Sequence, residues 1–450
     1  MKHNHNFDKP KSTQVRPVVI IDRPCGTGKT TEMIAGLVES KRYLVVTPLL
    51  SECERIIRDA RVAFMQPEVI QDDPEIDTKK DHLIALLEAR HNVVTTHAMF
   101  NNLADVEKMG LLDGYEIIID EVMSVVDDGY RVKKKTWEQF YVNDGYVDIN
   151  PDTGLITPTD LWVEHLEDVD DALSTSLYHA ANAGRLYHLS DGINLAVMPE
   201  GLLKAGNSLT VYTYKAEGSI MFAYLKRLGL DPVHDTGSPE IEQRFVRQAR
   251  ELITVKDIRT LRGINLSYTS QTKTNSKKLD ELVPKALSGL RRNRMSEVWL
   301  PDILITTPKS KWYRKGKDPK IGECGELLTP FKPGPYASGS RLSPAGHTEV
   351  RATWVPNTTR GTNDYKHCTH AIYLYDQNIN PSILNWFGGP KVISNDDYAL
   401  TELIQWLWRT QVRDGYPITL FLPSQRMQEL LLNWLWEGQI PPNEWRKIRA

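Results

Sequence analysis

The sequence predicts an α/β protein in which two parallel-sheet domains stand in tandem, the first with an insertion. Short apolar, β-branched runs alternate with helix-like segments in both halves of the chain, a pattern typical of parallel strands buried on both faces. The 450 residues exceed what one ordinary core accommodates and suffice for two or three domains. Because such sheets bind ligands at the carboxyl ends of their strands, we expect function to lie in the residues that follow each strand.

The first domain is expected to span residues 1–235. A helix with a capping box is predicted to begin at Ser51, and the strand Leu209 to Thr213 returns to the sheet after an interruption. The runs that predict the other strands are Pro17 to Asp22, Tyr43 to Thr47, Asn92 to Thr95 and Tyr115 to Asp120.

The interruption covers residues 131–205, which are aromatic-rich and locally acidic. It contains a predicted hairpin from Tyr146 to Thr157, turned at the sequence Pro-Asp-Thr-Gly. We interpret this segment as an insertion that faces solvent or a protein partner.

The second domain is expected to span residues 236–450. A helix is predicted from Asp396 to Arg413, and Lys315 to His347 is rich in Pro, Gly and Ser, which predicts a long loop. The predicted strands are Asp302 to Thr306, Ala352 to Val355, Ala371 to Tyr375 and Ile418 to Leu422.

The composition excludes several classes of protein. No run approaches the roughly 18 apolar residues that a membrane span requires. The four cysteines (Cys25, Cys53, Cys324 and Cys368) lie far apart without a C-x-x-C pair, which argues against a disulfide framework or a zinc module. We therefore expect a reduced, cytoplasmic protein without a membrane partner.

A phosphate-binding loop follows the first predicted strand, where Arg23 to Thr31 reads R-P-C-G-T-G-K-T-T. The glycines let successive N–H groups point at a phosphate, the lysine supplies a point charge, and the hydroxyl of Thr30 suits Mg²⁺. A plain glycine-rich turn with an exposed lysine is the alternative, and the strand–loop–helix context argues against it. The predicted nucleotide-binding residues are Pro24, Cys25, Gly26, Thr27, Gly28, Lys29, Thr30 and Thr31.

Two adjacent carboxylates, Asp120 and Glu121, end the strand Tyr115 to Asp120. If these carboxylates belong to the same site as the phosphate loop, Asp120 is expected to hold Mg²⁺ through water, and Glu121 to orient and deprotonate an attacking water. A solvated strand end is the alternative when this motif stands alone.

These two motifs resemble those of superfamily 2 helicases, the group that includes the DEAD-box proteins. Three further segments also resemble helicase motifs. Leu44 to Ile56 and Val93 to Phe100 lie between the phosphate loop and the two carboxylates, and Val211 to Ser219 follows the carboxylates. The resemblance implies two RecA-like domains, ATP and Mg²⁺ at their interface, and a nucleic-acid strand across both. Divergent chains of this kind look most like helicases of bacteriophages or mobile elements.

Two later segments extend the resemblance into the second domain. Trp354 to Tyr365 resembles motif V, which implies a catalytic role for Arg360 and nucleotide contacts from Gly361 and Asp364. Gln405 to Arg413 resembles motif VI, and Gln405, Arg409 and Arg413 are spaced as one polar stripe on a helix. Either arginine is a candidate arginine finger, and an ordinary solvated helix face is the alternative.

The sequence also departs from the family. Trp408 stands where motif VI has a glycine, and T-Y-K replaces the usual motif III core. No glutamine motif precedes the phosphate loop, so adenine selectivity has no assigned residue.

Nucleic acid is the expected partner, as a single strand or fork, with DNA favoured over RNA. Ser276 to Lys320 carries 12 Lys/Arg against 5 Asp/Glu, with Trp312 among the charges. Basic groups neutralise phosphates and aromatic rings stack on unpaired bases, although a solvated surface is the alternative. The candidate contacts are Thr47, Thr96, Thr306, Lys309 and Trp312.

Together the motifs predict an ATP-dependent helicase or translocase that acts on DNA in replication or recombination. One alternative is a terminase-like DNA-packaging motor, which would need a nuclease fold in the second half. The other is a non-catalytic loader that binds nucleic acid without turnover.

Overall fold

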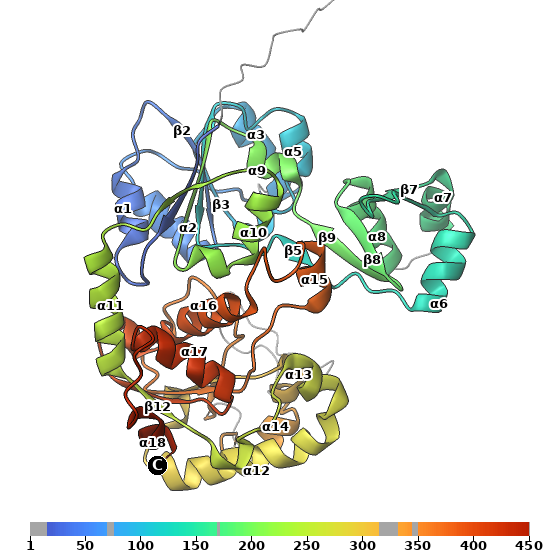
Figure 1. Ribbon diagram of the computed structural model, residues 1–450. Helices are drawn as coiled ribbons and strands as arrows, with labels where there is room; N and C mark the ends of the chain where they lie inside the picture. The colour runs from blue at the N-terminus through green and yellow to red at the C-terminus, as the bar shows by residue number, and fades with distance from the viewer. Residues whose placement is uncertain (1–15, 70–75, 169–171, 315–331, 344–349, 450) are drawn as a thin grey trace, which may run out of the picture.

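The structure has two parallel sheets, one above the other, and a smaller antiparallel unit beside the first (Figure 1). It is a computed structural model that describes residues 16–69, 76–168, 172–314, 332–343 and 350–449. Helices flank both sheets, and the predicted α/β class with two parallel-sheet domains is confirmed.

The first sheet has six strands in the order β11-β1-β10-β4-β2-β3, all parallel. Its strands are β1 (Val18–Asp22), β2 (Arg42–Thr47), β3 (Val93–Thr96), β4 (Tyr115–Asp120), β10 (Ser208–Thr213) and β11 (Val233–Asp235). The helical segments that connect them are α1 (Lys29–Ala35), α2 (Leu50–Asp59), α3 (Lys79–Glu88), α4 (His97–Phe100), α5 (Ala104–Lys108), α9 (Glu200–Lys204), η2 (Ala216–Gly218) and α10 (Ile220–Arg227). Five of these strands were predicted, and the three-residue β11 was not.

A separate antiparallel unit projects from the first domain between β4 and α9 (Figure 1). Its own core contains Trp137, Tyr141 and Trp162, and β6 and β7 form the predicted hairpin. Its elements are β5 (Val126–Asp127), α6 (Lys134–Thr136), η1 (Trp137–Asn143), β6 (Val147–Ile149), β7 (Ile156–Pro158), α7 (Asp160–Asp168), α8 (Ala172–Asn182), β8 (Leu186–Ser190) and β9 (Ile193–Val197).

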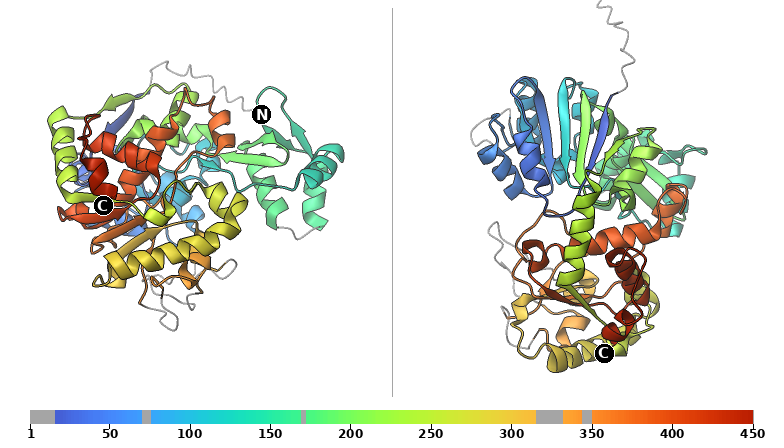
Figure 2. Two further views of the ribbon diagram at one scale, coloured as in Figure 1. Left: turned by 60° about the horizontal axis from the view of Figure 1, so that its bottom comes forward. Right: turned by 60° about the vertical axis from the view of Figure 1, so that its left-hand side comes forward.

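The long helix α11 (Pro239–Leu252) runs down one side of the molecule from the first sheet to the second (Figure 2). The second sheet has the order β12-β16-β15-β13-β14, again parallel. Its strands are β12 (Ile253–Lys256), β13 (Ile303–Thr306), β14 (Thr353–Trp354), β15 (His370–Tyr373) and β16 (Ile418–Phe421). Its helical segments are η3 (Arg259–Leu261), η4 (Ser270–Thr274), α12 (Ser276–Arg294), η5 (Leu300–Asp302), α13 (Lys309–Trp312), α14 (Pro335–Ser338), α15 (Pro381–Trp386), α16 (Asn395–Leu407), η6 (Gln411–Asp414), α17 (Gln425–Leu435) and α18 (Glu444–Arg449).

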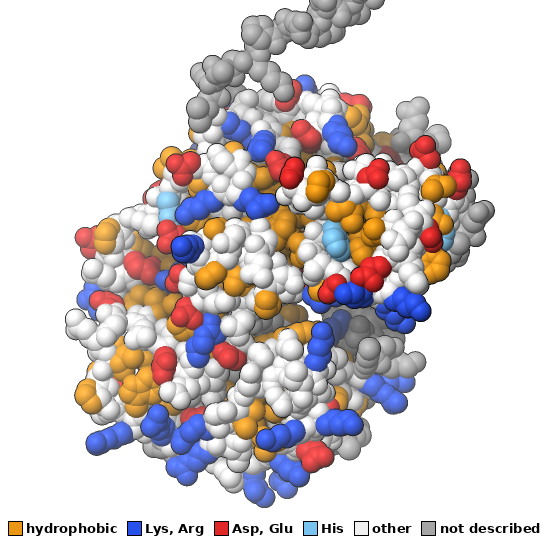
Figure 3. Space-filling model, turned by 45° about the vertical axis from the view of Figure 1, so that its right-hand side comes forward, with side chains coloured by type: hydrophobic (Ala, Val, Ile, Leu, Met, Phe, Trp, Pro, Cys, Tyr) orange, Lys and Arg blue, Asp and Glu red, His pale blue; other side chains and the backbone are white. Residues whose placement is uncertain are grey.

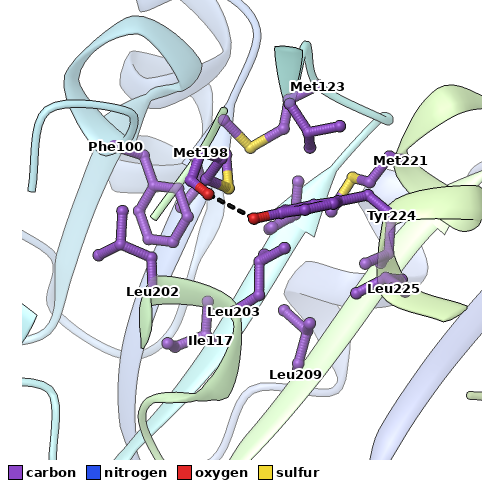
Figure 4. Close-up of a cluster of buried hydrophobic side chains, with 14 of the residues drawn as sticks. Phe100, Ile117, Met123, Met198, Leu202, Leu203, Leu209, Met221, Tyr224 and Leu225 are labelled. Atoms are coloured by element: carbon purple, nitrogen blue, oxygen red, sulfur yellow. Dashed lines mark hydrogen bonds between the residues drawn. The ribbon is translucent and has the colours of Figure 1, made fainter. Parts of the chain in front are cut away.

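The first domain is held by apolar side chains that fill the space between its sheet and helices (Figure 4). The ring of Tyr224 lies among Met123, Met198 and Met221, and its hydroxyl donates to the carbonyl oxygen of Met198 (2.5 Å). The hydroxyl is therefore satisfied although the side chain is buried.

Helix α16 lies between the two domains and is buried on almost every side. All residues from Thr401 to Leu407 are buried, because the first domain covers the face that the second domain leaves open. Gly218 in η2 makes this approach possible, since a Cβ there would come within 2.5 Å of the carbonyl oxygen of Asp397 and would collide with Thr401.

Three local predictions need correction. Helix α2 begins at Leu50 and has no side-chain cap, so the capping box at Ser51 does not form. Helix α16 ends at Leu407, and Arg409 and Arg413 lie in the turn and 3₁₀ segment beyond it, so the predicted polar stripe is interrupted. Of the predicted loop Lys315 to His347, only residues 332–343 are described, and they contain α14.

We predict that Gly218→Ala weakens the contact between α16 and the first domain. The added methyl group has no room, so we expect the free energy of unfolding to fall by about 1–3 kcal/mol in chemical denaturation. Gly289→Ala is the control, because a Cβ at Gly289 meets nothing within 4 Å. Because Gly289 lies in the middle of α12, Gly289→Ala should raise the free energy of unfolding by roughly 0.5–1 kcal/mol. Equal effects of the two substitutions would contradict the packing argument.

Candidate nucleotide site between the two domains

The phosphate loop lies between β1 and α1, at the edge of the first sheet that faces the second domain (Figure 1). Gly26 and Gly28 have φ angles of 78° and 86°, a region that residues with a Cβ seldom adopt. Lys29 is buried, and its Nζ donates to the carbonyl oxygens of Arg23 (2.9 Å) and Pro24 (3.3 Å). The loop thus encloses the ammonium group, which would have to exchange these carbonyls for phosphate oxygens if a nucleotide bound there.

Asp120 and Thr30 meet across the start of α1. The Thr30 hydroxyl donates to Oδ2 of Asp120 (2.9 Å), and Asp120 is 5% exposed. Burial, and then the neighbouring Glu121 carboxylate, raise the pKa of Asp120 to about 6. A hydroxyl beside a buried carboxylate suits Mg²⁺, whose charge would offset the cost of ionising Asp120 there.

Glu121 adopts a left-handed backbone conformation, with φ 63°, immediately after β4. Its N–H donates to the carbonyl oxygen of Tyr212 (2.8 Å), which holds the turn against β10. Its Oε2 is buried and has no hydrogen-bond partner among the described residues. A regular strand would send these two adjacent carboxylates to opposite faces, and the left-handed turn at Glu121 ends that alternation.

Two arginines of the second domain lie within electrostatic reach of Glu121. Arg409 is 2% exposed and donates to the carbonyl oxygens of Gln405 (3.2 Å) and Thr362 (3.1 Å). Burial lowers the pKa of Arg409, while Glu121 across the interface opposes the shift. The pKa of Arg360 lies above its ordinary value, because Glu402 and Glu121 together outweigh the effect of burial.

Arg413 lies against the phosphate loop. Its Cγ is 4.0 Å from the position that a Cβ on Gly26 would take. Within the described residues its guanidinium has no hydrogen bond or ion pair, unlike that of Arg409. Arg413 is therefore the arginine with a group available to a ligand, whereas Arg409 is fixed in the interface.

Gln405 joins the two domains directly. Its Oε1 accepts from the thiol of Cys25 in the phosphate loop (3.6 Å), and its Nε2 donates to the carbonyl oxygen of Tyr214 (3.3 Å). Burial raises the pKa of the Cys25 thiol, so it stays protonated. Gln405 thus positions the loop relative to α16.

The other predicted site residues lie around this centre. Arg360 pairs with Glu402 of α16, and Gly361 packs on Pro48 of the first domain, with no space for a Cβ. Asp364 is exposed and accepts from the hydroxyl of Thr362 (2.6 Å), so it lies at the rim. The Thr31 hydroxyl is likewise engaged, by Arg55 (3.0 Å).

His97 and Glu402 were not predicted as site residues. Burial lowers the pKa of His97 to about 4, so the ring is neutral, and its Nε2–H donates to the carbonyl oxygen of Asp120 (3.0 Å). His97 directly follows the carboxyl end of β3, and this position in the sequence could have predicted a site residue. Nothing in the sequence could have predicted Glu402, since its role depends on the burial of α16.

The structure corrects most of the predicted nucleic-acid contacts. Trp312 is 0% exposed in the core of the second domain, so its ring cannot stack on a base. Thr47 and Thr306 are also 0% exposed, and the Thr47 hydroxyl donates to the carbonyl oxygen of Leu49 (3.0 Å). Thr96 caps α4 through its side chain. Lys309 is exposed on α13 and stays a candidate.

The residues present fit a nucleoside triphosphate with Mg²⁺. The orphaned Glu121 oxygen, the two left-handed glycines and the Thr30–Asp120 pair are what such a ligand requires. Within the described ranges no group of three or more His, Cys, Asp or Glu is placed to hold a metal by itself. None of the described helices is both long and apolar enough to span a membrane.

This arrangement of two parallel-sheet domains is similar to the fold of solved helicases. A solved XPD helicase aligns with a TM-score of 0.50 and 12% identity over 94% of this chain and 95% of that one. A structure of S. tokodaii Xpd4 aligns with a TM-score of 0.49 and 12% identity over 95% of each chain. At this identity the likeness concerns the fold alone.

A closer relative in sequence comes from Bacillus subtilis (strain 168). The chain is 27% identical over 435 residues to the SPbeta prophage-derived uncharacterized protein YonV, covering 93% of this chain and 98% of that protein. Residues 247–435 also match the family described as the YonV C-terminal Rossmann-like domain. The match to a prophage protein agrees with the predicted link to mobile elements.

We predict that Asp120→Asn stabilises the protein at pH 8 in the absence of Mg²⁺ and nucleotide. Because folding raises the pKa of Asp120 from 3.8 to about 6, the free energy of unfolding falls as the pH rises between these values, since the carboxyl ionises first in the unfolded state. The amide removes this cost, which is about 3 kcal/mol above pH 6. Thermal melts should show a higher melting temperature for the variant at pH 8 and no such advantage at pH 4. An equal melting temperature at pH 8 would contradict the buried-charge argument.

We also predict that Trp312→Ala costs about 3–5 kcal/mol of stability through loss of core packing. Urea denaturation measures it, with Trp299→Ala as the matched control, since Trp299 is 58% exposed. The surface substitution should change stability by less than about 0.5 kcal/mol. A stable Trp312→Ala variant with weakened nucleic-acid binding would restore the stacking role.

Proposed function

We propose that the protein is an ATP-dependent helicase or translocase that hydrolyses ATP between its two domains. The observation that carries the proposal is that two residues of the second domain lie directly against the phosphate loop. Gln405 accepts from the thiol of Cys25 (3.6 Å), and Cγ of Arg413 is 4.0 Å from the position of a Cβ on Gly26. A nucleotide in the phosphate loop would lie next to groups from both domains, so its hydrolysis would depend on how they meet.

Each residue then has a role in hydrolysis. Lys29 and the N–H groups of Gly26 and Gly28 would bind the phosphates, and bound Mg²⁺ would neutralise charge on them. Oε2 of Glu121, which is buried and unpartnered, would accept a proton from the attacking water. Arg413 would reach the developing charge, while Arg409 would keep the interface closed.

Nucleic acid is the proposed substrate, along which the protein would move. Lys and Arg side chains are numerous on the surface of the second domain (Figure 3). Helix α12 has four exposed basic side chains, Lys277, Lys278, Lys285 and Arg292. Contacts of this kind are made to the phosphate backbone, so binding would weaken steeply with salt and depend little on sequence. We favour DNA over RNA, in replication or recombination of a mobile element, and the similarity to a prophage protein supports this setting.

The proposal predicts different outcomes for the phosphate-loop lysine and the interface arginines. Lys29→Ala should abolish hydrolysis and weaken ATP binding. Arg413→Ala and Arg409→Ala should leave ATP affinity nearly intact, and loss of the arginine finger should lower turnover by about 10³-fold. ATP affinity and steady-state turnover, measured with single-stranded DNA, single-stranded RNA and forked duplex in parallel, test this. Wild-type turnover in both arginine variants would refute a shared site.

The same assays separate the alternatives. A loader without catalysis would bind nucleic acid and show no turnover with any of the three substrates. A packaging motor would hydrolyse ATP and also cleave duplex DNA in a metal-dependent nuclease assay.

A further inference from the structure

A cavity of about 500 Å³ opens directly beside the phosphate loop. Cys25, Gly26 and Thr27 form one wall, α11 forms a second, and the segment from Trp408 to Gly415 forms the third. This volume lies within the range of pockets that hold small ligands. The cavity therefore adjoins the place where the phosphates of a nucleotide would bind.

The floor of the cavity is aromatic and buried. Phe245 of α11 and Trp408 pack with ring centroids 4.5 Å apart, and both are more than nine-tenths buried. Tyr214 and Trp434 contact Phe245 edge-on from the other side (5.4 and 6.0 Å). An apolar floor supported in this way is suited to a flat, largely apolar group.

Two polar side chains of α11 lie at the rim of the cavity. Arg244 and Gln248 lie one turn apart on the exposed face of α11, and within the described residues neither side chain makes a hydrogen bond or ion pair. The Gln248 Nε2 is 3.6 Å from where a Cβ on Gly415 would be, so the amide reaches across to the third wall. Both side chains are thus available to a ligand at the mouth of the cavity.

We propose that this cavity binds the adenine base of the nucleotide, with Gln248 as the residue that selects it. A side-chain amide both donates and accepts, which matches the N7 acceptor and N6 amino donor of adenine and mismatches the N7 and O6 acceptors of guanine. The guanidinium of Arg244 stacks on the exposed face of the base. This inference rests on the proposed function and gives a residue to the base recognition that the sequence motifs leave unassigned.

The test compares ligands with and without a base. Binding of ATP, GTP and inorganic tripolyphosphate is measured by calorimetry for the wild type and for Gln248→Ala. We expect the variant to bind ATP about tenfold more weakly and to lose its preference over GTP, because the bidentate contact is gone. Its affinity for tripolyphosphate should not change.

Two further variants serve as controls. Gln243→Ala removes an exposed glutamine of the same helix that does not line the cavity, and it should bind all three ligands like the wild type. Arg244→Lys keeps the charge and loses the flat stacking surface, so it should weaken both nucleotides and spare tripolyphosphate.

The outcomes distinguish this inference from the proposed function. If Gln248→Ala keeps both the ATP affinity and the ATP preference of the wild type, the inference is overturned while the motor proposal stands. If the wild type binds neither ATP nor tripolyphosphate, the proposed function fails and the base site falls with it. Equal weakening of all three ligands would show that Gln248 supports the phosphate site and not the base.

Discussion

The packing of α16 against the segment after β10 is the contact on which the candidate site depends. The Thr401 hydroxyl donates to the carbonyl oxygen of Lys215 (3.3 Å), and Gln405 bridges Cys25 and the carbonyl oxygen of Tyr214. These bonds form only where Gly218 lets the helix approach. Because Arg409 and Arg413 follow the end of α16, a shift of this helix would move both away from the phosphate loop.

A second contact limits how the domains can move. Helix α15 belongs to the second domain by sequence, but Ile379, Ile383 and Phe387 are buried in the core of the first. Trp386 lies under the guanidinium of Arg227 (4.1 Å), which also donates to its carbonyl oxygen (2.9 Å). Burying three such side chains contributes roughly 1.5–3 kcal/mol each as an upper estimate. Any relative rotation of the sheets must therefore be taken up on either side of α15.

The sequence predicted the fold well and the site in part. Apolar β-branched runs mark β1, β2, β4 and β10, because strands that are buried on both faces need apolar residues at almost every position. The edge strand β11 has only three residues, which are too few to leave a pattern. The stripe predicted through Arg413 was wrong because spacing does not reveal that α16 ends at Leu407. Trp312 has basic neighbours in the sequence, yet its side chain is buried in the core of the second domain. Its burial depends on tertiary contacts, which local composition does not reveal.

Some of the buried polar atoms that lack a partner in the described part of the chain lie where the two domains meet. Glu121 Oε2, Arg360 NH1, Glu402 Oε2 and Thr213 Oγ1 are all buried without a hydrogen-bond partner in the described residues. Each such atom costs about 1–3 kcal/mol relative to a paired one, and Glu121 adds backbone strain. Residues from both domains contribute these atoms, so no rearrangement within one domain satisfies them all. The acceptor oxygens of a ligand such as a nucleoside triphosphate would pair with the unpaired donors, and its bound cation would offset the negative charge of the carboxylates. The binding free energy of such a ligand would then be coupled to the approach of the two domains, as the proposed function requires.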